Sequence, residues 1–161
     1  MRKKIFLAAI VFIIFASCNS RSAFNFSQDV VKKEQSLTAD INSTEDKVKI
    51  FLGKQQYDSI AAAGATMEKL VDVKLNEIKE QPAPDVKEAP AFKDASINYF
   101  RFIKSMYTGY KEFGNAPTPE AREQQMTRLR QIVDQKTGAI HDMQVAQKKF
   151  ADANGFKLDG N

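Results

Sequence analysis

Four stretches of the chain place apolar residues at alternating steps of three and four, and residues that stop helices separate these stretches. They cover about 30–51, 60–78, 91–113 and 126–150. Steps of three and four bring side chains to one face of an α-helix. None of the stretches shows the alternation of β-branched residues that indicates a strand. The chain is therefore expected to bury its apolar faces by packing helix against helix, which predicts an all-α fold.

Residues that end or begin helices lie between the stretches. Gly53 is expected to cap the first helix in the left-handed conformation, with residues 54–56 as a tight turn. A helix that continues through Gly53 is the alternative. Three prolines within 81–91 stop the second helix and predict a semi-extended connection. After a break at 114–117, Thr118 is expected to be the N-cap of the last helix.

The last stretch reads as one helix that runs to a C-cap at Asn154-Gly155. Its inner stripe extends from Met126 to Phe150 and includes Lys136. Phe156 is placed to make the hydrophobic contact that accompanies such a cap.

The third stretch is the most aromatic and is expected to be the most buried helix. Its predicted inner stripe is Phe92, Ala95, Tyr99, Phe102, Ile103, Met106, Tyr110 and Phe113, widened by Phe100 and Tyr107. The small residues Ala61–Ala65 are expected to lie opposite 104–108, where Met106 and Tyr107 fill the space beside them. Gly64→Leu should then overpack the core.

The start of the chain has the organisation of a secretory signal. Arg2, Lys3 and Lys4 precede an apolar run, which ends in small residues directly before Cys18, the only cysteine. The run of about a dozen residues is short of the ~20 that span a membrane. This segment resembles a bacterial lipoprotein signal, in which the cysteine is lipidated, although Phe15 replaces the usual leucine. A conventional signal beside a free thiol is the alternative.

These patterns predict three parts of the chain. Residues 1–17 are a lipoprotein signal peptide, 18–23 a lipid-anchored tether, and 24–161 a single domain. The domain is predicted to be an antiparallel four-helix bundle with up-down-up-down topology and coiled-coil-like stripes. Asn19 after the cysteine favours the outer membrane of the cell envelope, with the periplasmic or surface face left open.

The charge of the chain argues against a nucleic-acid partner. The formal net charge is +4, but without the three basic residues at 2–4 there remain 21 Lys and Arg against 20 Asp and Glu. Nucleic-acid binding needs a clustered basic face, which this balance does not indicate.

The sequence offers little for catalysis. His141 is the only histidine, and Gly138 stands three residues before it, where a di-iron bundle would need Glu. We expect His141 to face solvent or to lie at the boundary of the core, rather than to bind a ligand. No glycine-rich phosphate loop is present, and Gly64, Gly109 and Gly138 are expected at close helix approaches or, less favoured, beside a ligand. The chain is predicted to be no enzyme and to hold no cofactor and no metal.

Several segments resemble an uncharacterised family of bacterial surface or outer-membrane lipoproteins. The segments are Phe24-Asn25, Gln28–Val31, Phe92–Ala95, Tyr99, Phe102, Tyr107 and Phe150–Phe156. The resemblance implies a helical domain and an outer-membrane lipid anchor. It implies no activity and supplies no catalytic residue.

Two functions fit these predictions. The first is a non-enzymatic binding or scaffold module of the cell envelope; the alternative is a small-molecule carrier with an apolar cavity between its helices. Loops on a rigid scaffold are the usual place of function, and the two turns far from the anchor face outward. Gln56, Tyr57, Phe113 and Asn115 are therefore the predicted contacts for an envelope protein partner, unless these turns are plain connectors.

Overall fold

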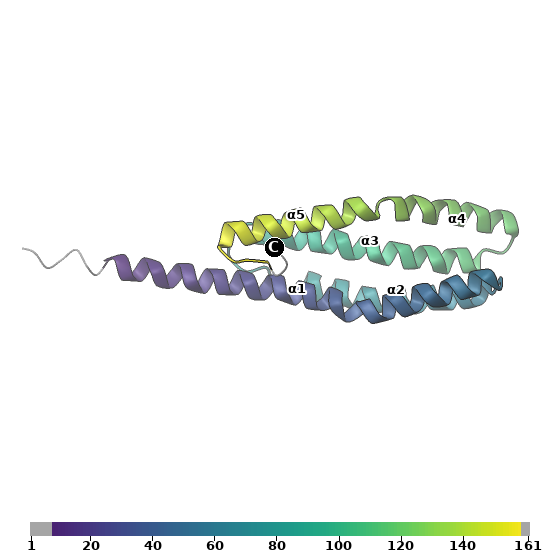
Figure 1. Cartoon of the computed structure of the whole chain (residues 1–161), viewed down its shortest axis with the longest axis horizontal. Coiled ribbons are helices and arrows are strands. Elements are labelled where there is room, and N and C mark those ends of the chain that lie inside the picture. The colour runs from purple at the N-terminus through teal and green to yellow at the C-terminus, as the bar shows by residue number, and fades with distance from the viewer. Residues whose placement is uncertain (1–7, 159–161) are drawn as a thin grey trace, which may run out of the picture.

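The computed structural model describes residues 8–158, which are helical throughout apart from turns and connections and contain no strand. Their helices are α1 (Ala8–Gly53), α2 (Tyr57–Glu80), α3 (Ala89–Asn115), α4 (Pro119–Asp134) and α5 (Lys136–Asn154). α5 continues in the direction of α4, so the helices form four rods lying side by side (Figure 1). The chain reverses direction between successive rods. The predicted antiparallel four-helix bundle is confirmed.

The N-terminal part of α1 projects beyond the other helices (Figure 1). Residues 19–23, predicted as part of a short tether, continue this helix, and Ala23 is already fully buried. At 1.5 Å per helical residue, the path from 18 to 23 is about 8 Å rather than ~20 Å. The helical path is thus shorter than the ~20 Å that the tether could reach if it were fully extended. The basic residues at 2–4 lie outside the described residues.

α1 ends at Gly53 as predicted, but a different residue turns the chain. Gln55, with φ 55°, takes the left-handed conformation, and Gly53 stays helical. The amide of Gln56 donates to the carbonyl of Phe51 at 2.9 Å, and that of Gln55 donates to Leu52 at 3.1 Å. This pair of bonds is the Schellman motif, which satisfies the last helical carbonyls. The expected role of Gly53 as the left-handed cap is thus wrong.

The predicted ends of the fourth rod are confirmed. The Thr118 hydroxyl accepts a hydrogen bond from the Ala121 amide at 3.1 Å, and Pro119 is the first helical residue. Gly155 takes φ 68° after α5, and the Phe156 ring lies 5.6 Å from that of Phe150.

The rod itself is interrupted at Gln135, where a single helix was predicted. The Gln135 amide donates to the carbonyl of Ile132, three residues back, at 3.1 Å. Lys136, Thr137 and Gly138 are all exposed, so Lys136 does not belong to an inner stripe. No buried side chain there holds the helix straight, so the series of helical hydrogen bonds is interrupted. The nearby Gly138 also makes the helix less stable by about 1 kcal/mol relative to alanine.

α3 is rotated relative to the predicted stripe. Phe100 and Tyr107, expected at the edge, are almost fully buried, whereas Tyr99, Phe102 and Met106 are half-buried. The reason is that α3 packs against α2, α4 and α5, so its buried arc is wide and centred between these neighbours. At one end of the core, the Phe92 and Phe150 rings stack with centroids 5.0 Å apart.

α2 and α3 approach each other closely enough for glycine to be required. A Cβ added at Gly64 would lie 2.6 Å from the amide nitrogen of Lys111 and 2.8 Å from the carbonyl oxygen of Tyr107. A Cβ at Gly114 would lie 2.5 Å from the Tyr57 carbonyl oxygen. The predicted α2–α3 pairing is confirmed, but its register and nature differ. Ala61 faces Gly114 rather than 104–108, and backbone meets backbone instead of a large side chain.

Two polar clusters lock this register. Glu68 pairs with Lys111 and accepts from the Thr108 hydroxyl at 2.6 Å. One turn further, Asp72 pairs with Lys104 at 2.6 Å. Burial raises the pKa of Glu68, but hydrogen bonds from Lys111 and Thr108 and the charges of Lys111 and Lys104 together lower it by more, so this pKa lies below its ordinary value.

Replacing Gly64 or Gly114 with alanine should push the two helices apart. We expect each variant to lose about 1–3 kcal/mol of unfolding free energy, because the new methyl group meets backbone atoms that cannot turn away. The matched control is Gly138→Ala, since a Cβ there meets nothing within 4 Å. The control should gain up to ~1 kcal/mol from helix propensity. Urea unfolding followed by circular dichroism measures all three, and equal effects at the three positions would contradict the close approach.

Candidate functional site

The two turns predicted to face away from the anchor lie at the same end of the bundle, opposite the projecting part of α1 (Figure 1). We call this end, formed by residues 53–57 and 113–130, the outer end. The Tyr57 and Phe113 rings meet edge to face, with centroids 5.8 Å apart. The guanidinium carbon of Arg122 lies 4.2 Å above the centre of the Tyr57 ring. Arg122 also donates to the Ala116 carbonyl at 2.8 Å, which ties α4 to the loop before it.

The four predicted contact residues have different environments. Gln56 and Asn115 are exposed, and Tyr57 is half-buried beneath Arg122. Phe113 is only 6% exposed and belongs to a small core cluster with Val48 and Ile60. Phe113 therefore supports the outer end from below and presents little of itself to a partner.

A surface hollow of about 520 Å³ opens at the outer end. It is lined by Gln55, Tyr57, Phe113, Pro119, Arg122, Glu123, Met126 and Arg130. The α4 residues in this set were missed by the sequence analysis, which considered only the turns. A signal was present: Arg122 and Met126 lie one and two turns after the Thr118 cap, so they had to stand beside the loops.

Tyrosine–glutamate hydrogen bonds cross the bundle between α1 and α3. The Tyr99 hydroxyl donates to Glu34 at 2.7 Å, and the Tyr110 hydroxyl donates to Glu45 at 2.8 Å. Burial, and then the neighbouring carboxylate, raise the pKa of both tyrosines above its ordinary value. Glu34, a charged residue within the first predicted helical stretch, is thus paired with a specific tyrosine.

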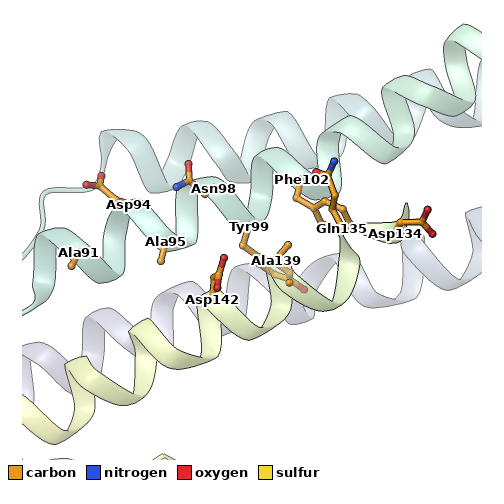
Figure 2. Close-up of a pocket in the computed structure, with 11 residues that line it drawn as sticks. Ala91, Asp94, Ala95, Asn98, Tyr99, Phe102, Asp134, Gln135, Ala139 and Asp142 are labelled. Atoms are coloured by element: carbon orange, nitrogen blue, oxygen red, sulfur yellow. The ribbon is translucent and has the colours of Figure 1, made fainter. Parts of the chain in front are cut away.

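A second hollow, of about 700 Å³, lies between α3 and the α4–α5 rod, and we call it the side groove (Figure 2). It is lined by Ala91, Asp94, Ala95, Asn98, Tyr99, Phe102, Asp134, Gln135, Gly138, Ala139 and Asp142. The sequence analysis did not find it. Gly138 was expected at a close helix approach, but a Cβ added there would meet no atom within 4 Å, and the residue opens onto this space.

His141 is exposed, as predicted, and no group of three His, Cys, Asp or Glu residues within 8–158 is arranged to hold a metal ion. Within the same part of the chain, none of the helices has the length and apolarity that crossing a membrane requires. Comparison with protein-family models, curated proteins and solved structures found no match for this chain.

Arg122→Ala should loosen the outer end, because it removes the cation over Tyr57 and the hydrogen bond to Ala116. We expect a loss of about 1–2 kcal/mol in unfolding free energy. Arg128→Ala, an exposed arginine in the same helix, is the matched control and should change stability by less than about 0.5 kcal/mol. Urea unfolding of both variants measures these changes. Equal losses of unfolding free energy would show that Arg122 does not stabilise the outer end.

Proposed function

We propose that the chain is a bacterial lipoprotein, anchored through Cys18, whose helical bundle is a non-enzymatic binding or scaffold module of the cell envelope. The charged start, the short apolar run and the single cysteine support the anchor. Asn19, directly after the cysteine, supports a location of the lipoprotein in the outer membrane. The resemblance to surface lipoproteins agrees with both points and leaves the partner to be identified.

The composition of the outer end is the observation that supports a binding module. It joins tyrosine, arginine and methionine side chains around one hollow, and these residue types are enriched at the centres of protein interfaces. Arg122 is already held in place by Tyr57 and Ala116. A partner that binds there would therefore spend little free energy on ordering it.

α1 supports the same proposal because it links the anchor to the outer end without a break. Residues 18–53 lie in one helix, which at 1.5 Å per residue is about 53 Å long. An anchored chain of this form would hold the outer end at a set distance from the lipid surface.

The carrier alternative has weaker support. A carrier would need an enclosed apolar cavity, whereas the side groove is open to solvent and is lined by three aspartates. At the anchor end of the bundle, phenylalanine rings pack between the rods: Phe92 stacks on Phe150 and meets Phe26 edge to face.

Lipidation predicts that cells fed an alkyne-tagged fatty acid will incorporate the tag into the wild-type protein. A chain carrying two or three acyl groups should also enter the detergent phase on phase separation. Cys18→Ala should carry no tag, whereas Ser22→Ala, the matched control four residues on, should keep it. An untagged wild-type protein, or a tagged Cys18→Ala variant, would show the anchor to be wrong.

Cysteine-directed photo-crosslinking in cells tests the outer end as the partner contact. The crosslinker is placed at Gln56→Cys or Asn115→Cys, which are exposed and avoid the left-handed position of Gln55. The control positions at the opposite end are Asp85→Cys and Lys157→Cys, also exposed. We expect protein adducts from the first pair. Adducts that form only from the second pair would place the contact at the anchor end.

A further inference from the structure

α4 buries less of itself than the other helices of the bundle. All residues of α4 are described, and of these only Leu129 is buried. α2 buries seven residues, α3 buries nine, and α5, which continues the same rod, buries three. Leu129 also lies outside both core clusters, and Met126 packs against the smaller cluster only from a half-buried position. Because most of the stability of a helix in a protein comes from its buried apolar face, α4 is held weakly.

Polar contacts do not compensate for this small buried face. Within residues 8–158, no ion pair and no side-chain hydrogen bond joins α4 to another helix. The Arg122 guanidinium over the Tyr57 ring is the polar contact that α4 makes with a neighbouring helix. In α5, by contrast, the Gln147 side-chain amide donates to the Ser27 hydroxyl of α1 at 3.1 Å. The two halves of the fourth rod are thus attached to the bundle by different means.

Leu129 lies on the backbone of α3 at Gly109. A Cβ added at Gly109 would be 2.8 Å from the Leu129 Cδ1 atom, so the leucine fills the space that the glycine leaves. Two hollows border α4 nearby. One of about 260 Å³ is lined by Gly109 and Ile132, and the hollow of about 520 Å³ at the outer end is lined by Met126. Side chains that line a hollow lack the close contacts of a packed core, which leaves Leu129 as the one buried attachment of α4.

Both ends of α4 lie where the chain can change its path without disturbing the core. Residues 133–138, around the interruption at Gln135, are all exposed. Before α4, the side chains of Asn115, Pro117 and Thr118 are exposed as well. Helical hydrogen bonds support one another along a continuous helix, and the interruption at Gln135 removes this support between α4 and α5. Loss of α4 would therefore not unwind α5.

We propose that α4 opens as a separate unit: it leaves α3 and unwinds while α1, α2, α3 and α5 stay packed. Proteins open first where few buried contacts hold a segment in place. The hollow at the outer end is lined by α4 residues together with Tyr57 and Phe113, so it exists only while α4 is closed. Opening therefore switches this surface between an assembled and a dismantled state. The opening itself does not depend on a partner that binds there.

Amide hydrogen exchange of the full chain in a non-ionic detergent, at several low urea concentrations, tests the proposal without any substitution. We expect the protection factors of amides 123–133 in α4 to be at least about tenfold lower than those of amides 143–151 in α5. The α4 protection should also fall with urea, with a smaller slope than global unfolding. Equal protection in both halves of the rod would overturn the proposal. So would α4 exchange that is independent of urea, because it would report fraying alone.

A disulfide between α3 and α4 gives a second test. In the Gly109→Cys/Leu129→Cys variant the two Cβ positions are 3.7 Å apart, within the range of about 3.5–4.5 Å that a disulfide needs. Oxidation should raise the protection factors of amides 123–133 at least about tenfold over the reduced form of the same variant, which is the matched control. It should also abolish the urea-dependent opening of α4 below global unfolding. Unchanged α4 protection, with the bond confirmed by non-reducing peptide mapping, would overturn the proposal.

Discussion

The backbone contact between α2 and α3 is the constraint on which the other contacts depend. With Gly64 against the Tyr107–Lys111 turn and Gly114 against Tyr57, the two helices can meet in only one register. That register places Glu68 beside Lys111, and it places Tyr57 against Phe113 at the outer end. Since a glycine is needed on both helices, a slip of one turn would bring a Cβ into the neighbouring backbone. The contact of Tyr57 with Phe113, which both line the hollow at the outer end, thus depends on the close approach that the two glycines allow.

Local signals made most of the fold predictable from the sequence. The Thr118 cap, the Gly155 cap and the proline-rich connection each act within a few residues, so they are visible in the chain alone. The rotation of α3 and the break at Gln135 depend on which helices lie nearby, and no local pattern records that. The left-handed residue after α1 was misplaced for a related reason: Gln55 takes a strained φ because the Schellman bonds to Phe51 and Leu52 compensate for it.

The candidate sites were predictable to different degrees. Exposure of Gln56 and Asn115 followed from turn composition, and both are exposed. The burial of Phe113 agrees with its place in the predicted inner stripe, but the sequence alone did not identify Ile60 and Val48, from two other helices, as the residues that cover it. The side groove could not be found at all, since it is defined by small residues on helices about forty positions apart. Asp142 looks like any solvated carboxylate until the register places it beside Tyr99.

The tyrosine–glutamate bonds connect α1 to this arrangement. Glu34 and Glu45 are 11 residues apart, and so are Tyr99 and Tyr110, which is close to three helical turns on each helix. A rotation of α1 by one residue, about 100°, would remove both carboxylates from their tyrosines and leave the hydroxyls of two half-buried side chains without these partners. In the anchored protein that we propose, α1 enters the bundle from the lipid surface. The same two bonds would then fix how the bundle is turned about its anchor, and with it the direction in which the side groove opens.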